Sequence, residues 1–316
     1  MLKRIETHQV RAGMFIEAIE GAWHDQAWQK HRFLLRGDDT VQKLKASNAG
    51  AVVINTAKGF DVNGSAGDRA VSVESGGDRV KVDAAAALQT VQQSATLLGN
   101  VFENASVGGA VSIDEAAGIV SEISKSIDHN PSVFVSVTRL KSKDETTFVH
   151  SISVSALLIH FGHYLGLDEP TVQLLGMGGL LHDIGKLEVP SEILNKKGSL
   201  EPHEMKLMQR HADLGHQILS RQAGMPAVAL DICRHHHERI DGKGYPARLS
   251  GAGFSVYARM AAICDVYDAI TSVRPYKKPW SAGEALAWML KREGQFDRRL
   301  LKKFALCLSI TLARPA

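Results

Sequence analysis

The histidines of this sequence are concentrated in one stretch of the chain. Ten of the fourteen lie between His150 and His237, and imidazole is both the commonest metal ligand in proteins and a proton carrier near neutral pH. The segment HDIGK, His182 to Lys186, places an imidazole next to a carboxylate. Two such neighbours can reach one metal ion, but an adjacent His-Asp pair also occurs as a hydrogen-bonded or capping pair. Spacing along the chain must decide between these.

Several imidazoles and two carboxylates lie on separate predicted helices. They are His150, His182, Asp183, His211, the triplet His235, His236 and His237, and Asp265. Asp265 lies within an otherwise apolar segment, where burying a carboxylate is costly unless it is paired or bound to a metal. Helical bundles build dinuclear metal sites from side chains on facing helices. Nitrogen and oxygen ligands without thiolate suit Fe, Mn, Zn, Ni or Co better than Ca or Mg.

Cations accompany these candidate ligands. Lys186 follows the His-Asp pair by one helical turn, and the segment RPYKK places Arg274 and Lys277 after Asp265. A metal pair beside fixed cations suits a phosphate ester, because the metals generate hydroxide and the cations neutralise the non-bridging oxygens. Lys277 and the lysine that follows it could equally be solvated surface charges.

A short loop is predicted directly after the histidine triplet. The segment HHERIDGKGYP, His236 to Pro246, contains two glycines and ends in Tyr-Pro. That composition predicts a shaped loop rather than a helix. Because it follows histidines that could bind metal, the loop is a candidate lip over a substrate pocket.

The elements that must position these residues are predicted to be helices. From about residue 144 onward apolar residues recur at helical spacing. We expect helices over 146–166, 168–181, 202–222, 227–239 and 256–272. In the first of these helices, Ile152, Ala156, Ile159 and Tyr164 are expected to be buried.

Four regions follow one another along the chain. Residues 1–62 predict a small α/β domain, because RFLLRG, TVQKLKASNAG and AVVINT indicate strand, short helix and strand. Residues 63–83 are rich in Gly, Ser and Asp and are predicted to be a flexible linker. Connecting helices are expected over 84–143, and residues 144–316 are expected to form the helical domain that carries the candidate site.

Composition excludes several classes of protein. Of the 316 residues, 44% are hydrophobic and 22% charged, which is ordinary for a soluble globular protein of about two domains. A net charge of +3 and 6% aromatic residues give no basis for a nucleic-acid polymer or a membrane as partner. The sequence has no secretory signal, no run of the roughly 18 apolar residues that a membrane span needs, and no disulfide framework. We therefore expect a cytoplasmic protein.

Three segments, in this order, resemble the HD-GYP family of HD phosphohydrolases: HDIGK, HHERIDGKGYP and DVYDAITSVRPYK. The resemblance covers about residues 144–298. It implies an α-helical HD-type catalytic domain preceded by a small α/β N-terminal domain, and hydrolysis of the bacterial second messenger cyclic di-GMP at a centre of two, sometimes three, metal ions. Residues 1 to about 60 more weakly resemble the small domain of unknown function that often precedes HD-GYP modules, through GMFIEA and the tryptophan-rich segment.

The resemblance implies a role for each matching residue. The implied metal ligands are His150, His182, Asp183, His211, His236, His237 and Asp265. Asp183 would bridge two ions and, with Lys186, would form the catalytic pair, since the matching lysine contacts the scissile phosphate or assists protonation. Lys186, Tyr245, Arg274 and Lys277 match residues that bind the substrate.

Other matches and departures refine this expectation. Glu238, Asp241 and Asp268 match the family and are expected to orient ligands or the loop, whereas His235 is an extra residue before the two histidines of the family pattern. Trimetallic members carry a glutamate four residues before the first histidine, and that position is Thr146 here. This departure favours two divalent metal ions, with Fe or Mn preferred and other transition metals left open.

The hypothesis that follows is a cyclic di-GMP phosphodiesterase that lowers the second-messenger level. The first product would be pGpG, and a second cut to GMP is left open. The alternatives are a catalytically weak cyclic di-GMP sensor, an HD phosphohydrolase for another cyclic dinucleotide or a dNTP, and an interaction protein with a vestigial structural metal. A homodimer or a GGDEF-type signalling partner would fit. The tail after residue 304 departs from the usual family ending, which is expected to affect stability before chemistry.

Overall fold

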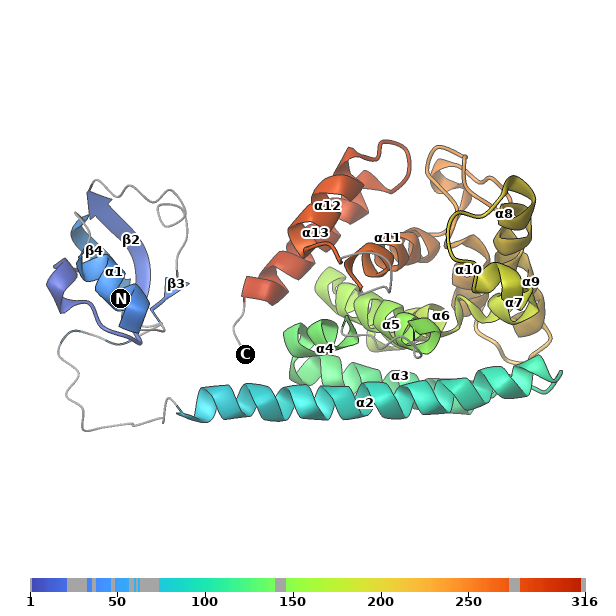
Figure 1. The fold of residues 1–316 in the computed structure, drawn as a ribbon, viewed down its shortest axis with the longest axis horizontal. Coiled ribbons are helices and arrows are strands. Elements are labelled where there is room, and N and C mark those ends of the chain that lie inside the picture. The colour runs from blue at the N-terminus through green and yellow to red at the C-terminus, as the bar shows by residue number, and fades with distance from the viewer. Residues whose placement is uncertain are drawn as a thin grey trace. The chain divides into compact units, whose positions relative to one another are not determined.

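The protein forms two compact units, Met1–Ser75 and Gly76–Ala316 (Figure 1). The first is built around a small sheet and the second is built from helices. This computed structural model describes residues 2–21, 33–35, 38–46, 49–56, 60, 62, 74–139, 146–272 and 279–313.

A four-stranded antiparallel sheet with one α-helix makes up the N-terminal unit. Its elements are β1 (Leu2–Ile5), the 3₁₀ helix η1 (Thr7–Gln9), β2 (Phe15–Gly21), β3 (Phe33–Leu34), α1 (Asp38–Lys45) and β4 (Ala49–Asn55), with the strands in the order β1-β4-β2-β3. Val41 and Leu44 of α1 pack into a core with Ile16, Val52 and Ile54 of the sheet. The predicted strand, helix and strand are confirmed as β3, α1 and β4.

The helical unit begins with a long helix, α2 (Glu74–Ser106). The linker predicted over 63–83 is therefore too long, because residues 74–83 are helical, while 63–73 lie outside the described residues. Alanines and other strong helix formers fill the segment that follows, and extending a helix costs far less than starting one. The glycines and aspartates at the start of α2 are therefore helical because the helix extends into them from the segment that follows.

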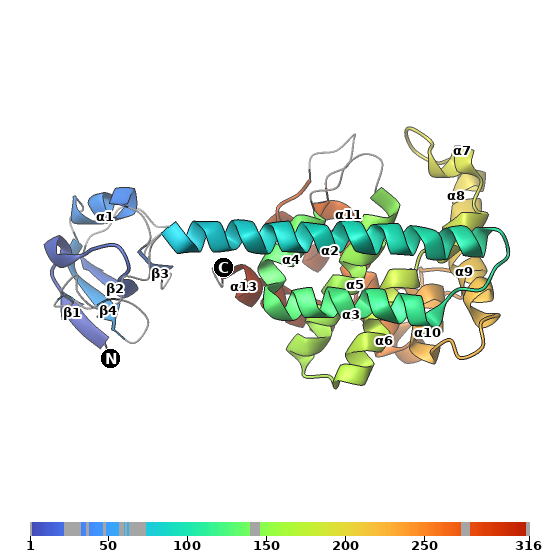
Figure 2. The same ribbon diagram turned by 90° about the horizontal axis from the view of Figure 1, so that it is seen from below.

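Thirteen further helices follow within the described residues, two of them of the 3₁₀ type. They are α3 (Ile113–His129), α4 (Pro131–Thr138), α5 (Thr146–Leu165), α6 (Glu169–Leu181), η2 (Ile184–Glu188), α7 (Ser191–Leu194), α8 (Pro202–Gln209), α9 (His211–Ser220), α10 (Ala227–His235), η3 (Gly251–Gly253), α11 (Val256–Thr271), α12 (Ala282–Lys291) and α13 (Arg298–Ala313); with α13 the described part of the chain ends. Figures 1 and 2 show α2 and α3 side by side along one face of this unit.

Helix α5 is the centre of the helical unit. It packs against α3, α4, α6, α11 and α13, and Ile152, Ala156 and Ile159 are buried as predicted. Tyr164, predicted to be buried, is 37% exposed because it lies in the last turn of α5, beyond the packed neighbours. The segment Phe148–Leu165 is long and apolar enough to cross a membrane, but 67% of it is buried inside the unit. Core packing therefore accounts for its apolar character.

The helix predicted over 202–222 is two helices. α8 ends at Gln209 and α9 begins at His211, with Arg210 between them. The amide of Arg210 donates to the carbonyl of Leu207, three residues earlier, where an α-helix would bond to the fourth. The His211 ring donates to the Met208 carbonyl (2.7 Å). The break turns the start of α9 toward η2, with which α9 packs.

The segment after residue 304 continues α13 and packs into the core. Phe304, Cys307 and Leu308 are buried. The Phe304 ring lies 5.2 Å from the rings of both Phe161 and Tyr267, edge to face. This end of the chain thus supports α5 and α11, the two helices that carry candidate ligands.

Candidate metal centre

The structure brings all the predicted metal ligands to one place. They come from α5, the α6–η2 junction, α9, the end of α10 and α11: His150, His182, Asp183, His211, His236, His237 and Asp265. All but His150 and His237 are buried. The candidate ligands thus lie where the helices converge, with two imidazoles at the accessible edge.

Asp183 lies between two groups of histidines. Its Oδ2 is 3.7 Å from Nε2 of His150 and 3.3 Å from Nε2 of His182. Its Oδ1 is 3.5 Å from Nε2 of His211 and 4.0 Å from Nε2 of His236. Each carboxylate oxygen therefore faces a different group, as a carboxylate that bridges two ions must.

The potential ligand atoms form two clusters. In each cluster, one atom from each of three residues lies within 4.8 Å of the others: His150, His182 and Asp183 in one, and His211, His236 and His237 in the other. Asp265 reaches both, since its Oδ1 is 3.1 Å from His150 Nε2 and its Oδ2 is 3.9 Å from His237 Nδ1. Two carboxylates and five imidazoles can thus hold two neighbouring cations.

Hydrogen bonds place a proton on Nδ1 of four of these histidines. In each, Nδ1–H donates to an oxygen: Gly179 O from His182 (2.8 Å), Met208 O from His211 (2.7 Å), Cys233 O from His236 (2.9 Å) and Asp268 Oδ2 from His150 (2.6 Å). Carbonyl and carboxylate oxygens only accept, so Nδ1 of each ring carries a proton. In His182, His211 and His236 this leaves the lone pair on Nε2, whereas Nε2 of His150 also faces the carboxylate of Asp265 at 3.1 Å. These Nε2 atoms are the ones that face Asp183.

Unsatisfied polar atoms at the centre fit a cation. Among the described residues, Nε2 of His182 and Oδ1 of Asp183 are buried without a hydrogen-bond partner. The Nε2 atoms of His211 and His236 lie 3.3 Å apart, and two lone pairs at that distance repel one another. Divalent metal ions, one at each cluster, would satisfy these atoms, so the residues present fit such ions.

The pKa values of the second cluster favour metal binding. Burial lowers the pKa of His237 to about 3 and also lowers the pKa values of His211 and His236. Burial alone would raise the pKa of Asp183, but the nearby His182 and Lys186 hold it well below its usual range. At neutral pH the three imidazoles are neutral and the carboxylate is ionised, which is the state that metal ligands require.

His150 has a different environment. Burial alone would lower its pKa, but the carboxylates of Asp265 and Asp268 raise it to about 9. Asp268 is itself buried, and it also accepts hydrogen bonds from the hydroxyls of Ser153 and Ser272. These contacts hold Asp268 against the His150 ring, as its predicted orienting role requires. The two serines were missed, although they lie one helical turn after His150 and Asp268, a spacing that brings side chains together on a helix.

We expect Asp268→Asn to lower metal affinity by about 10- to 100-fold, the usual cost of disturbing a carboxylate that orients a ligating histidine. Metal retained at graded chelator concentrations measures the effect. Asp231→Asn is a matched control, because Asp231 accepts a hydrogen bond from His235 (2.8 Å), which belongs to neither cluster. Equal metal retention in the two variants would contradict the expectation.

A buried carboxylate holds the loop after α10. Glu238 accepts hydrogen bonds from the amides of Ala247 (2.7 Å) and Leu249 (3.0 Å). Asp241 binds the guanidinium of Arg239. Both acids thus organise the loop, as predicted.

Two of the four residues predicted to bind substrate lie at the metal centre in the described part of the chain. Tyr245 lies over the centre, with its ring centroid 4.6 Å from that of His237. Lys186 pairs with Oδ2 of Asp183 while its side chain stays 30% exposed. Arg274 and Lys277 lie outside the described residues, so their phosphate contacts stay predictions.

Comparisons with known proteins agree with this fold. The HD domain family matches residues 125–300, and a domain of unknown function (DUF3391) matches residues 2–116. The solved structure of Bd1817, a HDG"Y"P protein from Bdellovibrio bacteriovorus, covers 98% of this chain and 100% of its own with a TM-score of 0.59 and 18% identity, a likeness of fold. The class defined by fold and site is a helical metal-dependent phosphohydrolase of the HD type.

Curated relatives narrow this class. The chain is 40% identical over 324 residues to "Cyclic di-GMP phosphodiesterase PA4108" of Pseudomonas aeruginosa, covering 98% of this chain and 77% of that protein. This chain belongs to the HD-GYP family. It is also 42% identical over 137 residues to "Cyclic di-GMP phosphodiesterase response regulator RpfG" of Xanthomonas campestris and 40% identical over 145 residues to "3'3'-cGAMP-specific phosphodiesterase 1" of Vibrio cholerae. These two matches span 36% and 33% of those proteins.

Proposed function

We propose that this protein is a metal-dependent phosphodiesterase that hydrolyses cyclic di-GMP to pGpG. The observation that carries the proposal is Asp183, whose two oxygens face two separate clusters of imidazoles. A pair of metal ions is a known device for clamping the attacking and leaving oxygens of a phosphodiester. Cyclic di-GMP is favoured as the substrate because the Pseudomonas aeruginosa relative, similar over nearly the whole chain, carries that activity in its name.

The residues divide the work as follows. His150, His182 and Oδ2 of Asp183 would hold one ion, and His211, His236, His237 and Oδ1 of Asp183 the other, with Asp265 at the edge of both. Bound there, divalent metal ions supply a hydroxide nucleophile and stabilise charge on the phosphate.

Lys186 and the loop act on the substrate. The ammonium of Lys186 lies at Oδ2 of Asp183, where it can neutralise a non-bridging phosphate oxygen or donate a proton to the leaving oxygen. Tyr245 covers the second cluster and limits access of water to it. Arg274 and Lys277 are proposed to anchor the phosphate from the segment after α11.

The identity and number of the metal ions, the location, the partner and the final product are also part of the proposal. Fe or Mn is the preferred metal, in a pair rather than a triplet, because Thr146 occupies the position where a third ion would need a carboxylate. A cytoplasmic location and a homodimer or GGDEF-type partner stay predictions, as does a further cut of pGpG to GMP.

The test is anaerobic turnover by the full chain loaded with Fe(II) or Mn(II), with products separated by chromatography. We expect cyclic di-GMP to give pGpG or GMP, and to be used faster than 3′3′-cGAMP in a parallel assay. Full metal occupancy and tight cyclic di-GMP binding without product would instead indicate a sensor. Faster use of 3′3′-cGAMP would change the substrate, and protein that takes up no metal would refute the ligand assignment.

A further inference from the structure

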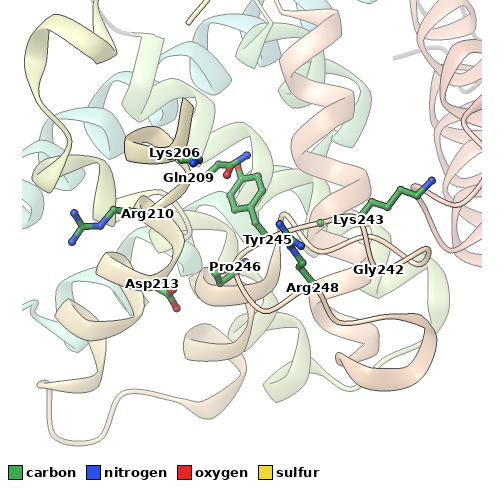
Figure 3. A pocket seen from close by; sticks show the side chains of 10 residues that line it. Lys206, Gln209, Arg210, Asp213, Gly242, Lys243, Tyr245, Pro246 and Arg248 are labelled. Atoms are coloured by element: carbon green, nitrogen blue, oxygen red, sulfur yellow. The ribbon is translucent and has the colours of Figure 1, made fainter. Parts of the chain in front are cut away.

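A pocket of about 540 Å³ lies beside the metal centre, between α8, the start of α9 and the loop residues 242–248 (Figure 3). Ligand pockets for nucleotide-sized molecules have volumes of this order. None of the seven candidate metal ligands lines it. Tyr245 is common to both places, because it lines the pocket while its ring packs against His237. A molecule that occupies the pocket would therefore reach the edge of the metal centre.

The pocket is basic. Lys206, Arg210, Lys243 and Arg248 line it, and Asp213 is the one acid among its described lining residues. Asp213 accepts a hydrogen bond from Arg234 (3.0 Å), so its charge is already balanced. Within the described part of the chain, Lys206, Arg210 and Arg248 form no ion pair. Cations without acidic partners in a concave site attract an anion.

The backbone that carries Arg248 is held in a strained conformation. Arg248 has a φ of 54°, and among the described residues it is the one non-glycine residue with positive φ. Such a conformation persists where the surroundings over-determine it, and it is frequent at ligand sites. Here the amides on either side, those of Ala247 and Leu249, both donate to the buried carboxylate of Glu238. The loop therefore presents Arg248 to the pocket from a fixed backbone.

The remaining polar lining suits a nucleobase. In Figure 3 the Tyr245 ring extends from the loop toward Gln209. The amide of Gln209, half-buried in the wall, can donate and accept at once, as the edge of a purine requires. The aromatic face of Tyr245 can stack against a base.

We propose that this pocket binds the guanylate half of the dinucleotide that is not being cleaved, with Lys206 and Arg248 on its phosphate. The proposal rests on the proposed function, since the phosphodiester under attack must lie at the metal centre while the other half passes Tyr245 into the pocket. Residues of α8 and of the end of the loop would then bind the substrate in addition to Arg274 and Lys277. Lys206 and Arg248 are therefore positioning residues for the substrate.

The test uses the full, metal-loaded chain with the double variant Lys206→Ala/Arg248→Gly. Glycine adopts positive φ without strain, so the loop conformation is retained. The matched control, Lys302→Ala/Lys303→Ala, removes the same charge from two exposed lysines of α13, which lies at the other end of the helical unit from α8 and α9 in both Figures 1 and 2.

Kinetics are measured with cyclic di-GMP and with bis(p-nitrophenyl) phosphate, a small phosphodiester without a second nucleotide. We expect the pocket variant to raise KM for cyclic di-GMP by about ten- to a hundredfold, the scale of lost charge-assisted hydrogen bonds. The increase in KM for bis(p-nitrophenyl) phosphate should be at least about tenfold smaller than the increase for cyclic di-GMP. Calorimetric affinity for 5′-GMP should fall in parallel with the loss on cyclic di-GMP.

Other outcomes separate the two proposals. Equal losses on both substrates, or KM values equal to those of the control, would overturn the assignment of the pocket. A wild-type protein that cleaves bis(p-nitrophenyl) phosphate but not cyclic di-GMP would overturn the proposed function instead. In that case the 5′-GMP affinities of the wild type and the pocket variant decide the pocket alone, and equal affinities would refute it.

Discussion

Asp183→Ala is expected to abolish turnover and to release the bound metal together. The side chain has one oxygen for each imidazole cluster, so its loss removes a ligand from both ions at once. We expect kcat/KM for cyclic di-GMP to fall by on the order of a thousandfold or more, the scale observed when one member of a set that acts as a unit is removed. Metal content by elemental analysis, measured on the same sample as activity, checks the coupling.

A second substitution at the same position separates charge from shape. Asp183→Asn keeps the side-chain volume and removes the negative charge that His182 and Lys186 now stabilise. We expect it to fold like the wild type and to lose metal and activity as the alanine variant does. Retention of both ions and at least a tenth of the activity in either variant would show that Asp183 does not bridge.

Gly185→Ala is expected to have the largest effect on stability. A Cβ atom at this position would lie 1.9 Å from the carbonyl oxygen of His211 and 2.4 Å from the amide nitrogen of Gly215. Both are backbone atoms that cannot rotate away, so η2 and α9 would have to separate. We expect a loss of about 3 kcal/mol or more in the free energy of unfolding, at the upper end of overpacking costs.

Denaturant unfolding in the presence of chelator measures this effect without a contribution from metal binding. Gly118→Ala is the matched control, because Gly118 lies within α3 and a Cβ there meets nothing within 4 Å. That variant should gain up to about 1 kcal/mol from better helix propensity. Similar unfolding free energies for the two variants would contradict the packing of η2 against α9.

Local pattern predicts much of this molecule. α5, α6 and α11 follow from apolar residues at helical spacing, and their ends agree with prediction to within a residue or two. The candidate ligands are predicted by residue type, order and resemblance, since His and Asp within apolar helices have few other roles. What local pattern cannot predict depends on contacts between elements. The break at Arg210 needs η2 as the neighbour of α9, and the basic pocket needs α8 and the loop after α10 to meet.

The N-terminal unit illustrates a second limit. β1 has only four residues, too few for a period of two to be distinguished from chance, and it becomes a strand through its ladder with β4. The start of α2 is the opposite case, because a polar segment without helical periodicity is helical by extension of its neighbour.

The hydrogen bonds from Nδ1 of His182, His211 and His236 end on main-chain carbonyls. The helix backbone consequently fixes the orientation of these three rings, even when no metal ion is bound. Binding of a cation therefore costs little side-chain conformational entropy, because the rings are already ordered. One metal ion can replace another without a rearrangement of these rings. We expect such a site to discriminate weakly among first-row metals, so that the metal bound depends on which metals are supplied. Through this site, cyclic di-GMP breakdown would become coupled to the metal status of the cell.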